Sequence, residues 1–258
     1  MRRHLVFCVA GTILFLGISS PARAQPQAPR PSDPYRLETQ RPGKTDVYIL
    51  SFGLWGPQSV FESEAKGAAR ILESRLGSKG RTVVRFNSKR RTEATPASLM
   101  GAAQAAGRAL DPAEDVVVLF LTSHGGPRGI ALAAGRSMSI MTPADVGAIL
   151  DAARARHRVV IVSACYSGTF ARALADARTL VITAAAADKP SFGCRDGAVW
   201  TYFGDAFFNR GMQGESRLDA AFEKARAFVT QRETREGFDP SDPQIAGGSL
   251  VLERLGLR

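Results

Sequence analysis

The sequence predicts an α/β sandwich in which helices cover both faces of a mostly parallel β-sheet. Residues 116–122 and 159–164 are short apolar runs rich in β-branched side chains, as expected of strands that are buried on both faces. Between them, residues 142–156 have a helical pattern, with Thr142 as the N-cap and Pro143 at the first helical position. A strand–helix–strand crossover is right-handed, so the two strands are expected to run parallel.

The remaining elements continue this alternation of strands and helices, which favours a three-layer sandwich. Further strands are expected at residues 46–52, 82–86 and 180–183, with residues 250–252 as a last strand or a docked tail. Further helices are expected at residues 59–76, 95–109, 169–177, 200–209 and 215–232. Residues 129–140 predict a small hairpin, and residues 184–198 predict a loop over the carboxyl edge of the sheet.

Composition limits the classes of function. The chain has 258 residues, 45% of them hydrophobic, which is enough for one well-buried α/β domain. The formal net charge is +10, to which Arg2, Arg3 and Arg23 contribute from an expected leader. Residues 89–91 form the only compact basic run, and no aromatic side chains interleave with it. Nucleic-acid binding is therefore not predicted.

The N-terminal residues predict export. A positively charged start, an apolar core and a small-x-small pattern ending at Ala24 make residues 1–24 a signal peptide. Residues 25–44 are rich in Pro, Gln and Arg and are expected to form a disordered linker before a domain at residues 45–258. No later stretch reaches the ~20 apolar residues that a membrane-spanning helix requires. The mature chain is expected in the periplasm or outside the cell.

The two central strands end in chemically reactive residues. The first is followed by His124, and the second by Cys165. In parallel strands both would emerge at the carboxyl edge of the sheet, where open α/β sheets bind ligands. His4 lies in the leader, and His157 lies at the amino end of its strand. His124 and Cys165 are therefore the expected catalytic pair, with a thiolate as nucleophile and an imidazole as general acid and base.

Two backbone N–H groups are expected to stabilise the oxyanion of such a reaction. Gly125 lacks a Cβ, so its N–H can approach the reacting carbonyl, and the N–H of Cys165 is the second donor. Such donors typically stabilise a transition state by ~3 kcal/mol each. The helix expected after Cys165 would favour the thiolate. This chemistry needs no cofactor.

The same residues have other interpretations. Cys165 and Cys194 lie outside the leader, and in an oxidising compartment a disulfide between them would remove the nucleophile. With His124 they would supply three zinc ligands, but the sequence has no CxxC or HxxxH spacing, and no metal site is expected. A side chain that orients His124 is not evident, and a backbone carbonyl can serve instead.

The order of these segments resembles a known family. An apolar strand with His-Gly, about forty further residues and an apolar strand with Ala-Cys resemble the caspase-like (clan CD) cysteine peptidases. Residues 191–194 and 201–205 resemble the legumain family, peptidase C13, as a bacterial-type member, and the likeness covers roughly residues 46–210. It implies a caspase-like fold and an endopeptidase that cleaves peptides or proteins through an acyl-enzyme. A transamidase of the same family and a catalytically inactive peptide-binding domain are the alternatives.

The resemblance also implies substrate-binding residues. Asp205 matches an acidic residue of the family that helps form the pocket for the side chain before the scissile bond. The family's arginine in the first helix falls at Glu62, and its acidic residue two positions before the cysteine falls at Ser163. Ser191 lies in the matching segment behind the cysteine. Two carboxylates without an arginine would prefer Arg or Lys over Asn or Asp at the cleavage site.

Overall fold

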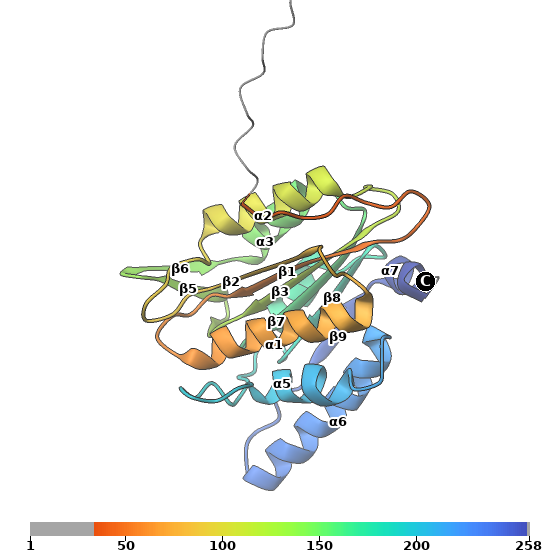
Figure 1. Ribbon diagram of the computed structural model, residues 1–258. Coiled ribbons are helices and arrows are strands. Elements are labelled where there is room, and N and C mark those ends of the chain that lie inside the picture. The colour runs from red at the N-terminus through yellow and green to blue at the C-terminus, as the bar shows by residue number, and fades with distance from the viewer. Residues whose placement is uncertain (1–33, 257–258) are drawn as a thin grey trace, which may run out of the picture. The chain divides into compact units, whose positions relative to one another are not determined.

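Residues 34–256 are described by the computed structural model of the protein, and their central feature is a six-stranded sheet between two layers of helices (Figure 1). The strands lie in the order β2-β1-β3-β7-β8-β9. Neighbouring strands are parallel throughout, except that β9 pairs antiparallel with β8. The bounds are β1 Val47–Gly53, β2 Thr82–Phe86, β3 Val116–Thr122, β7 His157–Ser163, β8 Thr179–Thr183 and β9 Gln244–Gly247.

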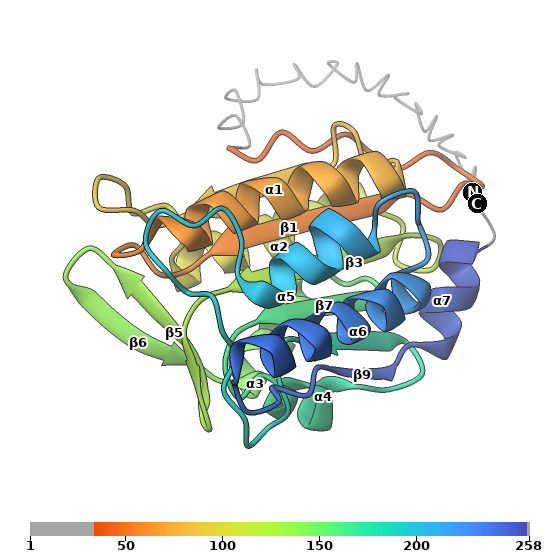
Figure 2. The same ribbon diagram turned by 90° about the horizontal axis from the view of Figure 1, so that it is seen from below.

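Helices cover both faces of this sheet, as predicted. One face packs against α2 (Pro96–Ala109), α3 (Pro143–Ala152) and α4 (Gly168–Leu174). The other face packs against α1 (Ser59–Leu76), α5 (Tyr202–Gly204), a π-helix η1 (Asp205–Gly211), α6 (Leu218–Glu236) and α7 (Ser249–Gly256), which Figure 2 shows in front of the sheet.

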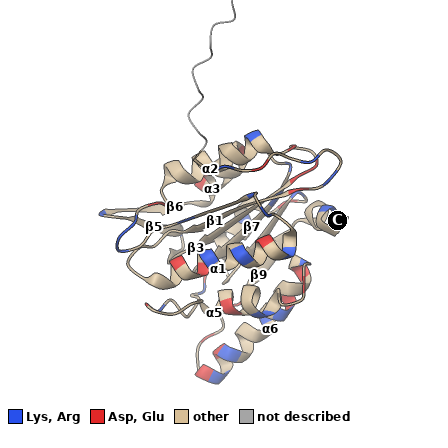
Figure 3. Ribbon diagram, in the orientation of Figure 1, with Lys and Arg blue, Asp and Glu red and all other residues tan. Residues whose placement is uncertain are grey.

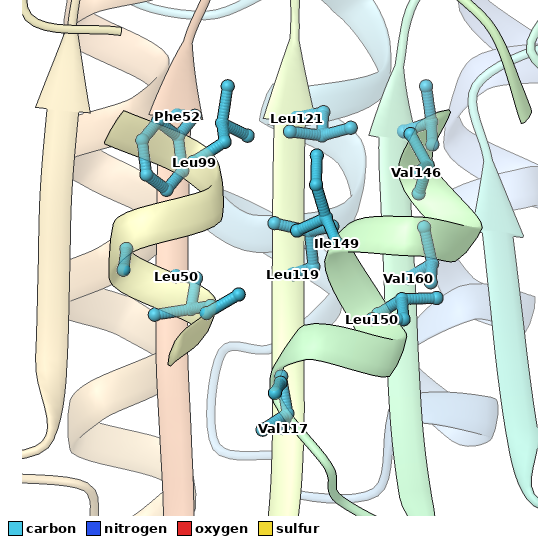
Figure 4. Packing of buried hydrophobic residues seen from close by; sticks show 14 of the residues in the cluster. Leu50, Phe52, Leu99, Val117, Leu119, Leu121, Val146, Ile149, Leu150 and Val160 are labelled. Atoms are coloured by element: carbon cyan, nitrogen blue, oxygen red, sulfur yellow. The ribbon is translucent and has the colours of Figure 1, made fainter. Parts of the chain in front are cut away.

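The continuous apolar runs of the central strands follow from this layering. Leu119 and Leu121 of β3 point toward α2 and α3, where they meet Leu99 and Ile149 (Figure 4). The alternate residues Val118 and Phe120 lie in the core of the opposite face. Because successive side chains of a strand enter different cores, every position is apolar.

A second, three-stranded antiparallel sheet continues from the end of β3. It consists of β4 (Gly125–Gly126), β5 (Gly129–Ala134) and β6 (Ser137–Met141). The pair β5 and β6 is the hairpin predicted from the sequence. Because β4 follows His124 directly, this second sheet lies beside the carboxyl edge of the main sheet.

Two sequence expectations are corrected by the structure. Residues 34–44, expected as the end of a disordered linker, lie along α2, where the Tyr35 hydroxyl donates to the Ser98 carbonyl (3.1 Å) and the Gln40 N–H donates to Ala109 (2.8 Å). Residues 250–252 belong to α7, because Val251 is buried against the sheet and Leu252 and Leu255 pack beside it at helical spacing. The last strand is β9, which the sequence did not predict.

The expected signal peptide and residues 25–33 of the expected linker lie outside the described residues. Within residues 34–256, no helix has the length and apolar content needed to cross a membrane. Basic and acidic side chains are interspersed along α1 and α6 (Figure 3).

Candidate active site

The register of β3 and β7 brings the ends of both strands to one edge of the sheet. Thr122 is the partner of Ser163, and the Ser123 N–H donates to the Ser163 carbonyl (3.2 Å). His124 and Cys165 each lie two residues beyond this pair and are partly buried. His157 begins β7 and therefore lies at the opposite edge. This register agrees with the expectation that His124 and Cys165 both emerge at the carboxyl edge of the sheet.

Gly125 packs directly against the backbone of Cys165. A Cβ at Gly125 would lie 2.1 Å from the Cys165 carbonyl oxygen and 3.0 Å from the Ala164 Cβ. No side chain fits at such distances, so the chain needs glycine at this position. The backbone segments that carry the two predicted oxyanion donors are therefore in contact.

Neither of these N–H groups has a hydrogen-bond acceptor among residues 34–256. Gly125 pairs with Ile130, and the Ala131 N–H donates to the His124 carbonyl (2.8 Å). This bond flanks a non-hydrogen-bonded antiparallel pair, so the Gly125 N–H points away from the ladder. The Cys165 N–H has no acceptor within residues 34–256.

The sulfur of Cys165 lies against the backbone of Ser191. The Ser191 N–H donates to Sγ (3.2 Å), and the thiol lies 3.4 Å from the Ser191 carbonyl oxygen. In the described part of the chain, no hydrogen bond links Sγ to His124. The next residue, Tyr166, has a φ of 56°. Non-glycine residues rarely adopt this left-handed conformation, and backbone strain of this kind is concentrated at functional sites.

Cys194 is a second free thiol close to the site. Burial, with smaller contributions from Glu64 and Cys165, raises its pKa to about 12. Cys194 therefore stays a neutral thiol at physiological pH and is a poor nucleophile. The two cysteines are not joined by a disulfide. No group of three or more His, Cys, Asp or Glu side chains within residues 34–256 is arranged to hold a metal ion.

The ring of His124 lies between aromatic side chains and an amide. Trp55 and Phe61 meet it edge-on, with ring centroids at 5.0 Å and 5.1 Å. Burial lowers the pKa of His124. Its Nε2 contacts the side-chain oxygen of Gln58. The Gln58 amide nitrogen donates to the Cys194 carbonyl (2.7 Å), so the amide oxygen is the atom left to accept from His124. His124 thus carries its proton on Nε2 and has Nδ1 free to accept one.

Gln58 contacts His124 at the candidate site and was not predicted from the sequence. It is the N-cap residue of α1, but its side chain makes no capping bond. Asp196 caps the helix instead, accepting from the Ser59 N–H (2.8 Å). The one feature of the sequence that could have identified Gln58 is its position in the loop that leaves the carboxyl end of the first strand.

The predicted acidic substrate pocket is wrong. Glu62 pairs with Lys66 (2.5 Å) on α1, and Asp205 pairs with Arg210 (2.9 Å) within η1. The two carboxylates line different hollows: Glu62 shares one with Asp196, Lys89 and Arg90, and Asp205 shares another with Arg210, Arg232 and Arg235. Glu62 and Asp205 therefore do not form one joint acidic pocket, on which the expected preference for Arg or Lys was based.

Ser163 and Ser191 also differ from the expectation. Ser163 is buried and points into the helical layer, where its hydroxyl lies 3.1 Å from that of Thr201. It cannot touch a substrate. Ser191 does lie at the site, but it meets Cys165 through its backbone.

Comparisons with known proteins agree with this geometry. Residues 79–250 match the model of the Peptidase C13 family. Among solved structures, the chain is similar to "structure of pro-sf-caspase-1", with a TM-score of 0.51 and 13% identity, covering 87% of this chain and 97% of that chain. At this identity the likeness shows a caspase-like fold alone. Among curated proteins, no sequence matches this chain.

Proposed function

The chain belongs to the peptidase C13 family, and on that basis we propose that this cysteine peptidase is an endopeptidase that uses Cys165 as nucleophile and His124 as general acid and base. The observation that carries the proposal is the register of β3 and β7, in which Thr122 is the partner of Ser163. His124 and Cys165 each follow two residues later, so the imidazole and the thiol leave the sheet at the same edge. The hydrogen bond from His124 to Gln58 supports it, because this bond leaves Nδ1 unprotonated.

The proposed reaction has two steps. Cys165 Sγ attacks the carbonyl carbon of the scissile peptide bond while His124 Nδ1 takes the thiol proton. The N–H groups of Gly125 and Cys165 stabilise the resulting oxyanion. His124 then gives the proton to the leaving amine, and the C–N bond breaks to form a thioester. Water, deprotonated by His124, hydrolyses this acyl-enzyme and regenerates the thiol.

We also propose that this reaction takes place outside the cytoplasm, in the periplasm or in secreted form. The support for this is the signal-peptide pattern of residues 1–24. N-terminal sequencing of the exported protein should give a chain that begins at Gln25, and a mature chain that retains Met1 would contradict export by cleavage.

The proposed activity is tested with a mixed peptide library in water enriched in ¹⁸O, with products identified by mass spectrometry. Internal cleavage with one solvent oxygen in each new carboxyl group is expected. Products that form only with an added amine, as amides, would identify a transamidase instead. An absence of products would leave a peptide-binding domain. The cleaved sequences also report the residue preferred before the scissile bond.

Replacing Gln58 by alanine is expected to lower kcat by about 10- to 100-fold, because His124 then loses the partner that fixes its tautomer and orientation. Replacing Gln58 by glutamate retains an acceptor but adds a negative charge, which raises the pKa of His124. The acidic limb of the profile of kcat/KM against pH should then move to higher pH. An unchanged limb in Gln58→Glu would show that Gln58 does not contact the working imidazole.

The aromatic packing around His124 predicts activity in mildly acidic solution. Burial lowers the pKa of His124, so the neutral base persists below the ordinary histidine pKa of about 6.5. Trp55→Ala should hydrate the ring and move the acidic limb of kcat/KM upward, toward pH 6.5. A limb that stays in place in Trp55→Ala would contradict this assignment.

A further inference from the structure

Glu64 is a carboxyl group buried inside the fold directly beneath the candidate active site. It lies on α1 in line with Val60 and Ala68, at positions that are otherwise apolar because they face the sheet. Its side chain is 0% exposed. Burying a carboxyl group is costly unless its oxygen atoms are hydrogen-bonded, so its partners indicate why the fold retains it.

Those partners come from the ends of both catalytic strands. The Thr122 hydroxyl, at the end of β3, donates to Oε2 of Glu64. Thr201 donates to Oε1 through its hydroxyl (2.6 Å) and its N–H (3.2 Å). The hydroxyl of Ser163, at the end of β7, lies 3.1 Å from the Thr201 hydroxyl. Because the Thr201 hydroxyl donates its proton to Glu64, Ser163 is the donor in this contact. Glu64 therefore binds the end of β3 directly and reaches the end of β7 through Thr201, in the segment that follows the loop carrying Ser191.

The surroundings leave no other evident use for this group. Within residues 34–256 Glu64 has no ion-pair partner, and the titratable group that faces it is the neutral thiol of Cys194. A Cβ at Gly204 would lie 1.8 Å from Oε1, so the backbone of α5 closes the site from below. Glu64 has no contact with solvent, and it is therefore not placed to touch a substrate.

We propose that Glu64 is a positioning residue that fixes the separation of Cys165 and His124 by binding the end of β3 directly and the end of β7 through Thr201. This role rests on the proposed function. Each catalytic residue lies two positions beyond Thr122 or Ser163, where the parallel pairing ends. The carboxyl group binds Thr122 directly and Ser163 through Thr201, so the segments beyond these two residues leave the sheet in a fixed relation.

Burial raises the pKa of Glu64, so the group retains its proton above the usual carboxyl range. Glutamine is neutral and has nearly the same shape: its amide oxygen can accept from Thr201, and its amide nitrogen can donate to the Thr122 hydroxyl, which then turns to accept. Glu64→Gln should therefore be the variant that preserves the network, and Glu64→Leu, of similar size, should be the variant that removes it.

The proposal is tested by the rate at which iodoacetamide alkylates Cys165 at each pH, read by peptide mass spectrometry, together with kcat on a cleaved peptide. Glu64→Leu should lower kcat by at least about tenfold, since displacements near 1 Å cost up to 10²-fold. The pH dependence of Cys165 alkylation in Glu64→Leu should approach that in His124→Ala. Glu64→Gln should show the wild-type kcat and the wild-type pH dependence of alkylation. Thr122→Val and Thr201→Val, which remove the donors, decide the matter if Glu64→Leu does not fold.

Glu233 provides a matched control. It is also a buried glutamate (2% exposed), but it lies on α6 and accepts from the Ser241 N–H (3.0 Å) instead of from the ends of β3 and β7. Glu233→Leu should change thermal stability without changing the alkylation profile. A wild-type profile in Glu64→Leu would overturn the role of Glu64 and leave the proposed function intact. The proposed function, and the positioning role with it, would be overturned by two results together: the wild-type protein cleaves no peptide, and its Cys165 alkylation rate depends on pH as it does in His124→Ala.

Discussion

Replacing Cys165 by alanine is expected to reduce peptide hydrolysis to the background rate, a loss of about 10⁶-fold if the site behaves as a nucleophile and base acting together. The variant retains every other group but lacks the sulfur that forms the acyl-enzyme. Within residues 34–256 the hydrogen bonds of the Cys165 side chain are those to the Ser191 backbone, so the fold should be retained. Initial rates on a peptide that the wild-type protein cleaves measure the loss, and circular dichroism checks the fold.

Cys194→Ala is the matched control for this prediction. It also removes a thiol near the site, but it leaves the backbone carbonyl that binds Gln58. Because burial raises the pKa of Cys194 to about 12, this thiol does not supply the nucleophile, and most of the activity should remain. An inactive Cys194→Ala beside an active Cys165→Ala would reverse the assignment.

Replacing Gly125 by alanine is expected to lower kcat by about 10²- to 10³-fold through a single methyl group. The new Cβ would lie 2.1 Å from the Cys165 carbonyl oxygen, so the two backbone segments must separate. One oxyanion donor then leaves its position, and loss of such a donor typically lowers kcat by about 10²- to 10³-fold. Overpacking should also destabilise the fold by about 1–3 kcal/mol. Single-turnover kinetics and thermal unfolding measure the two effects.

Gly126→Ala is the matched control for this substitution. A Cβ added at this adjacent glycine would have no heavy atom within 4 Å, so the extra methyl group meets open space. Its activity should stay within a few-fold of wild type. If both alanine variants kept full activity, the Gly125 N–H would not be part of the oxyanion site.

Sequence patterns predicted the elements whose burial is uniform. The strands at β3 and β7 were evident because both faces of the sheet are covered, which requires apolar residues at every position. Their parallel pairing followed from the crossover rule. The C-terminal segment was misassigned because three consecutive apolar residues occur equally in a strand and in a short helix.

The supporting residues of the site were not evident, because each depends on a tertiary contact. Gln58 reaches His124 from a different loop, and at the start of a helix it is expected to act as a cap. A clearer signal existed for Glu64, a carboxyl group on the apolar stripe of α1. The predicted pocket failed because Glu62 and Asp205 have cationic partners on their own helices, which sequence matching across families does not reveal.

Covalent trapping with a peptidyl electrophile tests the joint action of Cys165 and His124 most directly. The protein is treated with a peptide acyloxymethyl ketone built on a cleaved sequence, and the modified residue is located by mass spectrometry. We expect a single adduct on Cys165 that forms at least about 10²-fold more slowly in His124→Ala, the usual range for loss of a general base. An adduct on Cys194, or one on Cys165 that forms equally fast without His124, would contradict this joint action.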